Sequence, residues 1–224
     1  MATVGKNVLG DLRGKIGNTS ARIHNGKPIF ASLPSYFTTP QDENSVMRRN
    51  KFSSAVKMTK LILEDELVKS VWSQKNTTKM NTYNYLMKTN YRYLNGYLIT
   101  QLNQITPITG FLFNISNYAF NQNDIVVDID PISNLESATD IYIRILFQMS
   151  DPVVKEELPF EFAMLNSDPQ TFTPDTALNF TIPITPELSG FSNIYAVKQP
   201  LISLIAITAE GNLSAYSSTK LHTA

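Results

Sequence analysis

The sequence predicts an α+β protein in which an N-terminal β-hairpin and helices precede an antiparallel β-sandwich. Three observations support this fold class. An Asn-Gly pair separates two strand-like runs, apolar residues then recur at helical spacing as far as residue 98, and from about Ile105 the spacing changes to the alternation of strands. The change of period predicts two domains, residues 1–104 and 105–224.

The opening segment is rich in glycine, with four glycines in the thirteen residues from Gly5 to Gly17. Glycine is tolerated at this density where the backbone turns through positive φ or lies close to another backbone. The segment is therefore predicted to dock onto a partner. The candidate partner-binding residues are Gly10, Arg13, Gly14, Lys15 and Gly17, together with Arg48 and Arg49 farther along the chain.

A hairpin is predicted next, with strands at 15–23 and 28–33. Asn25-Gly26 supplies the two positive-φ residues of a type I′ turn. An isolated hairpin is only marginally stable in water, so it should pack on the helices or on another chain. Strand addition to a neighbouring sheet edge by this N-terminal region is one such arrangement.

Two amphipathic helices follow. Ser45 is the expected N-cap of the first, and the acidic residues 64–66 indicate a break and a new start, since carboxylates stabilise helix N-termini. The expected buried stripes are Phe52, Val56, Thr59, Leu63, Leu67 and Val71 in the first helix, and Met80, Tyr83, Met87, Asn90, Tyr91, Leu94 and Leu98 in the second.

Seven short strands are predicted in the second domain, at 110–115, 124–130, 140–149, 160–165, 177–184, 200–209 and 213–218. Short strands separated by turn clusters are typical of an antiparallel sandwich. The last two, joined through Gly211-Asn212, resemble the final hairpin of fibronectin type III domains. This resemblance extends the prediction to an immunoglobulin- or fibronectin III-like sandwich.

The formal net charge of zero conceals a strong asymmetry. Residues 1–104 contain 15 Lys and Arg against 6 Asp and Glu, whereas residues 105–224 contain 4 against 13. Opposite charge on two parts of one chain indicates different partners for the two parts, or a head-to-tail contact between copies.

The composition argues against an enzyme, and no cofactor is predicted. The chain has no cysteine, which removes thiol nucleophiles and thiolate metal sites. His24 beside the Asn-Gly turn and His222 near the C-terminus lack the third group that orients a catalytic base. Gly10–Lys15 has the wrong spacing for a phosphate loop. One face of a predicted strand carries Asp124, Asp128 and Asp130. We expect this face to be solvated, and a site for a hard cation is the alternative.

The basic half also contains the components of a nucleic-acid groove. Lys79, Lys88 and Arg92 are interleaved with tyrosines, as in base-stacking surfaces, although core packing accounts first for Tyr83 and Tyr91. The chain shows neither a continuous apolar leader region nor an apolar run of roughly 18 residues. We therefore expect no cleaved secretory signal and no membrane span.

Two segments carry a family resemblance. The first runs from Gly10 to Asn18 and continues at Asn25-Gly26-Lys27-Pro28, and the second joins Arg49-Asn50-Lys51-Phe52 to residues 81–90. Together they resemble an uncharacterised family found in Bacteroidota and related bacteria and their phages. Its members join a Gly-Lys-Ile/Val-Gly start to helices and a C-terminal fibronectin-like region. This chain departs from the pattern at Val46, where the family has Gln. The resemblance implies no particular activity, and the architecture is similar to that of accessory virion and filament proteins.

These observations predict a non-enzymatic structural protein that self-assembles or docks on a larger particle, such as a phage virion component or an extracellular filament subunit. Its expected partners are copies of itself or other structural proteins. They would meet in a virion or an extracellular assembly after synthesis in the cytoplasm. The alternatives are a nucleic-acid-binding module that uses residues 1–104 and a carbohydrate- or surface-binding immunoglobulin-like module.

Overall fold

The computed structural model describes residues 2–3, 14–16, 19–24, 27–32, 39–133, 135, 137–154 and 157–222. The chain forms two compact units, residues 1–42 and residues 43–224. The described residues confirm a mixed α+β protein with an N-terminal hairpin and antiparallel sheets.

The N-terminal unit contains a four-stranded antiparallel sheet in the order β1-β4-β3-β2. Its strands are β1 (Ala2–Thr3), β2 (Gly14–Ile16), β3 (Thr19–His24) and β4 (Lys27–Ser32). The predicted hairpin is confirmed as β3 and β4. Their pairing runs from Thr19 opposite Ser32 to His24 opposite Lys27. The predicted strand at 15–23 is wrong as one element: Lys15 pairs with Ser20, so the chain reverses within it. The Asn25-Gly26 turn lies outside the described residues.

The second unit begins with three helices, and a fourth precedes its longest strands. They are α1 (Glu43–Glu64), α2 (Glu66–Lys75), α3 (Thr82–Tyr93) and α4 (Pro186–Ile194). The predicted break at 64–66 is confirmed, with Asp65 as the N-cap of α2. Helix α1 starts at Glu43, two residues before Ser45, so Ser45 lies within its first turn and is not the N-cap. Helix α4 was not predicted, although Thr185 and Pro186 form a helix-start signal.

The strands of the second unit form two antiparallel sheets. The three-stranded sheet, in the order β10-β6-β5, contains β5 (Ile115–Phe120), β6 (Asp124–Ile129) and β10 (Leu178–Pro183). The six-stranded sheet, in the order β12-β11-β7-β8 with β13 on β11 and β9 on β7, contains β7 (Asp140–Pro152), β8 (Phe160–Asn166), β9 (Gln170–Thr171), β11 (Tyr195–Ile207), β12 (Leu213–Tyr216) and β13 (Lys220–Leu221).

Every predicted strand from residue 124 onward is confirmed, with shifted ends. The strand predicted at 110–115 is wrong. Only Phe111 forms a bridge there, parallel to Ser217, and the strand proper starts at Ile115.

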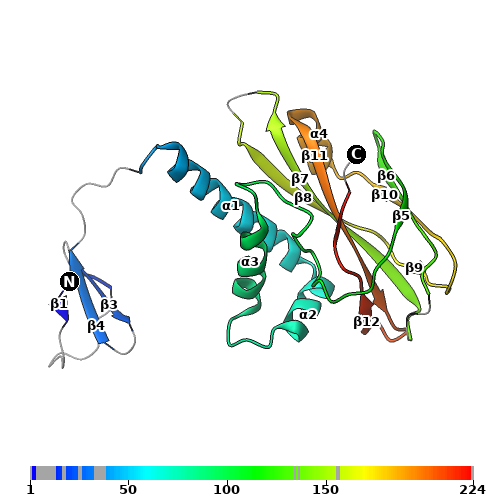
Figure 1. Cartoon of the computed structure of the whole chain (residues 1–224), viewed down its shortest axis with the longest axis horizontal. Coiled ribbons are helices and arrows are strands. Elements are labelled where there is room, and N and C mark those ends of the chain that lie inside the picture. The colour runs from blue at the N-terminus through cyan, green and yellow to red at the C-terminus, as the bar shows by residue number, and fades with distance from the viewer. Residues whose placement is uncertain are drawn as a thin grey trace. The chain divides into compact units, whose positions relative to one another are not determined.

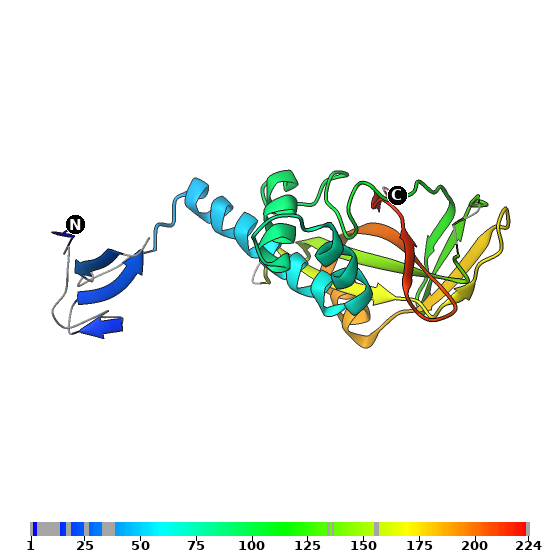
Figure 2. The same cartoon turned by 90° about the horizontal axis from the view of Figure 1, so that it is seen from below.

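The second unit is layered, with α1, α2 and α3 on one side of β7 and β11 and the three-stranded sheet on the other (Figures 1 and 2). Side chains of the two long strands alternate between these layers. Ile145 and its cross-strand partner Ile202 join the core shared with the three-stranded sheet. Leu146 and its partner Leu201 join the core shared with the helices. Both strands are therefore buried on both faces.

Two polar side chains of β7 bond to the helical layer. Arg144 on β7 donates from Nε to Asp65 Oδ2 at 2.6 Å. Gln148, also on β7, accepts from the Ile99 amide at 2.8 Å and donates to the Tyr97 carbonyl at 2.7 Å. Because helices and sheet share these bonds and one apolar core, the chain divides between residues 42 and 43 and not after residue 104.

Candidate binding surfaces

The predicted partner-binding residues fall in both units. Gly10, Arg13 and Gly17 lie outside the described residues. Gly14 and Lys15 form β2, where they pair with β3. Arg48 and Arg49 are exposed on α1, and Arg48 donates to the Asn44 carbonyl at 3.3 Å and to Ser45 Oγ at 3.4 Å. The structure thus places the first pair in a sheet and the second pair on the first turns of a helix.

The clearest apolar surface is a groove of about 410 Å³ between α1 and α3. We call it the helical groove, lined by Phe52, Met80, Asn84, Met87, Lys88 and Tyr91. Phe52 is 55% exposed, and Tyr91 is also exposed. Large apolar side chains gathered in an open groove are typical of protein-binding surfaces.

The assignment of these apolar residues to a buried stripe was wrong for Phe52 and Tyr91. Helix α1 buries Ser54, Ala55, Met58, Thr59 and Ile62, of which only Thr59 belongs to the predicted stripe. The small residues of this set allow α1 to lie close to the segment that follows α3. There Ser54 Oγ donates to the Tyr97 carbonyl at 2.7 Å. The buried face is therefore centred away from Phe52, although Thr59 is buried and Leu63 packs against the core.

Cations border the helical groove. Lys88 lines it directly, and Lys51 Nζ lies 5.0 Å from the centroid of the Tyr91 ring, within cation–π range. Lys88 also lines an adjoining hollow of about 230 Å³ together with Arg92. Among the described residues that line the groove, none is acidic. The groove therefore favours an apolar partner that carries negative charge.

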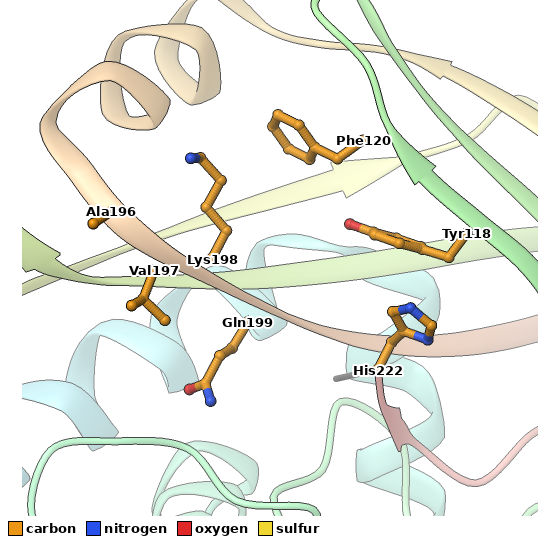
Figure 3. Close-up of a pocket in the computed structure, with 7 residues that line it drawn as sticks. All are labelled: Tyr118, Phe120, Ala196, Val197, Lys198, Gln199 and His222. Carbon is orange, nitrogen blue, oxygen red and sulfur yellow. The ribbon is translucent and has the colours of Figure 1, made fainter. Parts of the chain in front are cut away.

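A second hollow, of about 530 Å³, opens between β5 and β11 (Figure 3). Tyr118 reaches from β5 toward β11, and the His222 ring packs against it with centroids 4.5 Å apart. Lys198 rises from β11 toward Phe120, with Nζ 5.8 Å from the ring centroid. From the sequence, His222 was considered only as a candidate base without an orienting group, and no sequence signal linked it to Tyr118.

This hollow lies along a free stretch of sheet edge. On the side of β11 away from β7, β12 pairs with residues 205–207 and β13 pairs with Leu201 and Ile202. Within the described part of the chain, no strand pairs with residues 196–199 on that side. The described lining of the hollow contains no carboxylate.

Alkaline unfolding tests the burial of Tyr118. Burial raises the pKa of this phenol above its ordinary value of 10. The unfolded chain therefore releases the proton first, and the resulting stabilisation is complete below pH 10 and is lost above it. Above that pH, we expect the free energy of unfolding to fall about 1.4 kcal/mol per pH unit more steeply in the native protein than in Tyr118→Phe. Urea unfolding from pH 9 upward compares them; equal slopes would contradict the prediction.

The three strand aspartates do not converge on a metal site. Asp124 accepts from Asn121 at 2.6 Å. Asp128 on β6 accepts from Asn117 on β5 at 2.9 Å and from Asn179 on β10. These two hydrogen bonds link the three strands on their outer face. In the described ranges, no group of three or more His, Asp or Glu side chains is placed to hold a metal ion.

The tyrosines interleaved with cations serve several purposes. Tyr85 packs edge-on against Trp72, and Tyr97 stacks on Phe160 with centroids 5.3 Å apart. Their rings are therefore committed to packing within the unit. Of these three tyrosines, only Tyr91 is exposed, and its ring lies in the helical groove beside Lys51 and Lys88.

Comparison with known proteins gives no family. No family model and no curated protein matches the chain. A crystal structure of a β-glucosidase from Kluyveromyces marxianus aligns with 59% of this chain and 16% of that chain, at 11% identity and a TM-score of 0.24. So low a score carries no argument about fold or activity. Among the described residues, no helix combines the length and apolar character needed to cross a bilayer.

Proposed function

We propose that this chain is a non-enzymatic structural protein that self-assembles or docks on a larger particle, as a phage virion component or an extracellular filament subunit. One observation carries the proposal: the helical groove exposes Phe52 and Tyr91 beside Lys51 and Lys88. An exposed apolar groove of this kind is stabilised by covering it, so a protein partner is its expected occupant.

The charge distribution supports a partner that resembles the other end of the same unit. Residues 43–104 contain ten Lys and Arg against four Asp and Glu, and residues 105–224 contain four against thirteen. Complementary charge steers two copies toward one another and fixes their register. In this proposal the basic helical layer of one copy meets the acidic strand region of another.

The two sheets are proposed to form an immunoglobulin- or fibronectin III-like sandwich. A single apolar cluster that draws on β6, β7, β10 and β11 supports this, together with the β11–β12 hairpin and its Gly211 turn at φ 79°. Sandwiches of this class host many functions, so the fold itself does not select one. The family resemblance in the N-terminal segment favours the virion or filament setting.

Solution mass across salt concentration tests the proposal. We expect full-length protein to form ordered species larger than the 25.1 kDa chain at low salt, and to dissociate as salt screens the opposite charges. Sedimentation velocity measures the mass, and negative-stain images show whether large species are rings, filaments or shells. A monomer at every salt and protein concentration would overturn self-assembly. Salt-sensitive binding to single-stranded nucleic acid by that monomer would favour the nucleic-acid module instead.

A further inference from the structure

The loop between β7 and β8 carries a second exposed apolar surface. We call it the β7–β8 loop and define it by four of its described residues, Val153, Val154, Glu157 and Leu158. Val153 is 72% exposed and Leu158 is 55% exposed, and Val154 is also exposed. Glu157 is exposed between them and gives the apolar surface a negative charge.

Hydrogen bonds hold the β7–β8 loop in shape. The Val153 amide donates to the Ile194 carbonyl at 2.8 Å, and the Glu157 amide donates to the Val154 carbonyl at 3.2 Å. The Tyr195 hydroxyl donates to the Leu158 carbonyl at 3.1 Å. Burial, followed by the charges of Glu161 and Glu157, raises the pKa of Tyr195, so this hydroxyl keeps its proton. These bonds hold Val153, Glu157 and Leu158 in place before binding, which lowers the ordering cost at these residues.

We propose that the β7–β8 loop of one copy seats in the helical groove of the next copy. This inference rests on the proposed function and specifies the contact that would build the assembly. Val153 and Leu158 would cover Phe52, and Glu157 would face Lys88. The match is one of apolar surface with apolar surface and of carboxylate with ammonium, on two segments of the same chain.

A contact between two different surfaces of one chain has a defined consequence for symmetry. It is heterologous, so each copy uses its groove for one neighbour and its loop for another. Such contacts close into rings or continue as filaments. The groove lies on α1 and α3, whereas the loop joins β7 to β8. A single loop in a groove of this size is a small interface, so each contact is expected to be weak.

Charge reversal tests the pairing of groove and loop. We expect Lys88→Glu and Glu157→Lys each to weaken self-association about tenfold, since each places like charges together. The double variant in one chain restores opposite charges across every contact and should return to within about threefold of the native protein. The matched controls are Lys60→Glu and Glu210→Lys, which make the same charge changes at exposed positions elsewhere. Sedimentation velocity at low salt measures all five variants.

Cross-linking provides a second test that does not depend on charge. The chain contains no cysteine, so two introduced thiols report one contact. When Phe52→Cys protein is mixed with Leu158→Cys protein under mild oxidation, we expect a disulfide-linked pair. Molecular oxygen is the oxidant and accepts the two hydrogens that the thiols lose. Phe52→Cys mixed with Glu210→Cys should not. Each residue is exposed, so the substitutions leave the core intact.

The outcomes separate this inference from the proposed function. If Lys88→Glu and Glu157→Lys self-associate as strongly as the native protein and no selective cross-link forms, the groove–loop contact is overturned. Assembly would then use another surface. Recovery in the double variant together with the selective cross-link would support the contact. A native chain that stays monomeric and does not cross-link would overturn both the groove–loop contact and self-assembly.

Discussion

Replacing Asp65 with alanine is expected to destabilise the folded protein by about 3–5 kcal/mol. The Asp65 carboxylate has two roles, one on each oxygen. Its Oδ2 accepts from Arg144 Nε at 2.6 Å, and its Oδ1 accepts from the Val68 amide at 2.9 Å as the N-cap of α2. The side chains of Asp65 and Arg144 are 6% and 5% exposed, so removing the acid leaves a buried cation without its counter-charge.

Two further variants separate the ion pair from the cap. Asp65→Asn keeps an oxygen for the Val68 amide and removes only the charge, so it should recover about 1 kcal/mol of the alanine loss. Asp65→Ala combined with Arg144→Leu removes both charges, and its cost should be smaller than the sum of the single losses. That result would show that the stranded guanidinium, more than the missing attraction, causes the damage.

The neighbouring residue offers a matched control. Glu66 is 80% exposed and pairs with Lys69 on the same helix at 2.8 Å. Glu66→Ala should change the free energy of unfolding by no more than about 0.5 kcal/mol, because solvent screens exposed ion pairs. Urea unfolding followed by Trp72 fluorescence measures each variant. A loss of under about 1 kcal/mol for Asp65→Ala would contradict the buried-pair argument.

The Asp65–Arg144 pair also shows where sequence reasoning reached its limit. The acidic run at 64–66 correctly predicted a helix break, because capping is a local effect between neighbouring residues. The partner is 79 residues away on a strand, and no local pattern specifies such a pairing. One signal was present: Arg144 is a lone cation within an apolar strand, and a charge in that position needs a buried counter-charge.

The division of the chain failed for a related reason. The change of apolar period near residue 105 is real, but it marks a change of element type and not a domain boundary. The signal against a boundary lay in β7 and β11, whose long apolar runs lack the polar alternation of a sheet with one solvated face. Continuous runs of this kind require cover on both faces, and the helices supply the second cover.

The candidate surfaces were only partly foreseeable. The cations of residues 79–92 were considered only as part of a nucleic-acid groove, and of these Lys88 lines the helical groove. The sequence did not assign Phe52 to that groove, because a helix with apolar residues on more than one face allows several rotations about its axis. Tertiary packing chose the face through Ala55 and Met58 for burial, which left Phe52 exposed.

Gly110 is expected to tolerate no side chain, and its replacement by alanine is the second large effect. The backbone of residues 110–111 lies directly against the end of β12. The Phe111 amide donates to the Tyr216 carbonyl, and the Ser218 amide donates to the Phe111 carbonyl, both at 2.9 Å. A Cβ on Gly110 would lie 2.5 Å from the carbonyl oxygens of Ser217 and Tyr216. Those atoms belong to the backbone, so they move only if these hydrogen bonds break.

We therefore expect Gly110→Ala to cost about 3 kcal/mol, the upper end of the usual range for overpacking. Gly190→Ala is the matched control, since it adds the same methyl group inside α4. Apart from its chain neighbours and the backbone of α4 itself, no atom lies within 4 Å of the added Cβ. That change should instead stabilise the protein by about 0.5–1 kcal/mol, because alanine favours the helix over glycine. Urea midpoints distinguish the two signs, and amide hydrogen exchange at Phe111 and Ser218 should accelerate only in Gly110→Ala. If both glycine variants unfolded at the same urea concentration, the close backbone approach at Gly110 would have to be wrong.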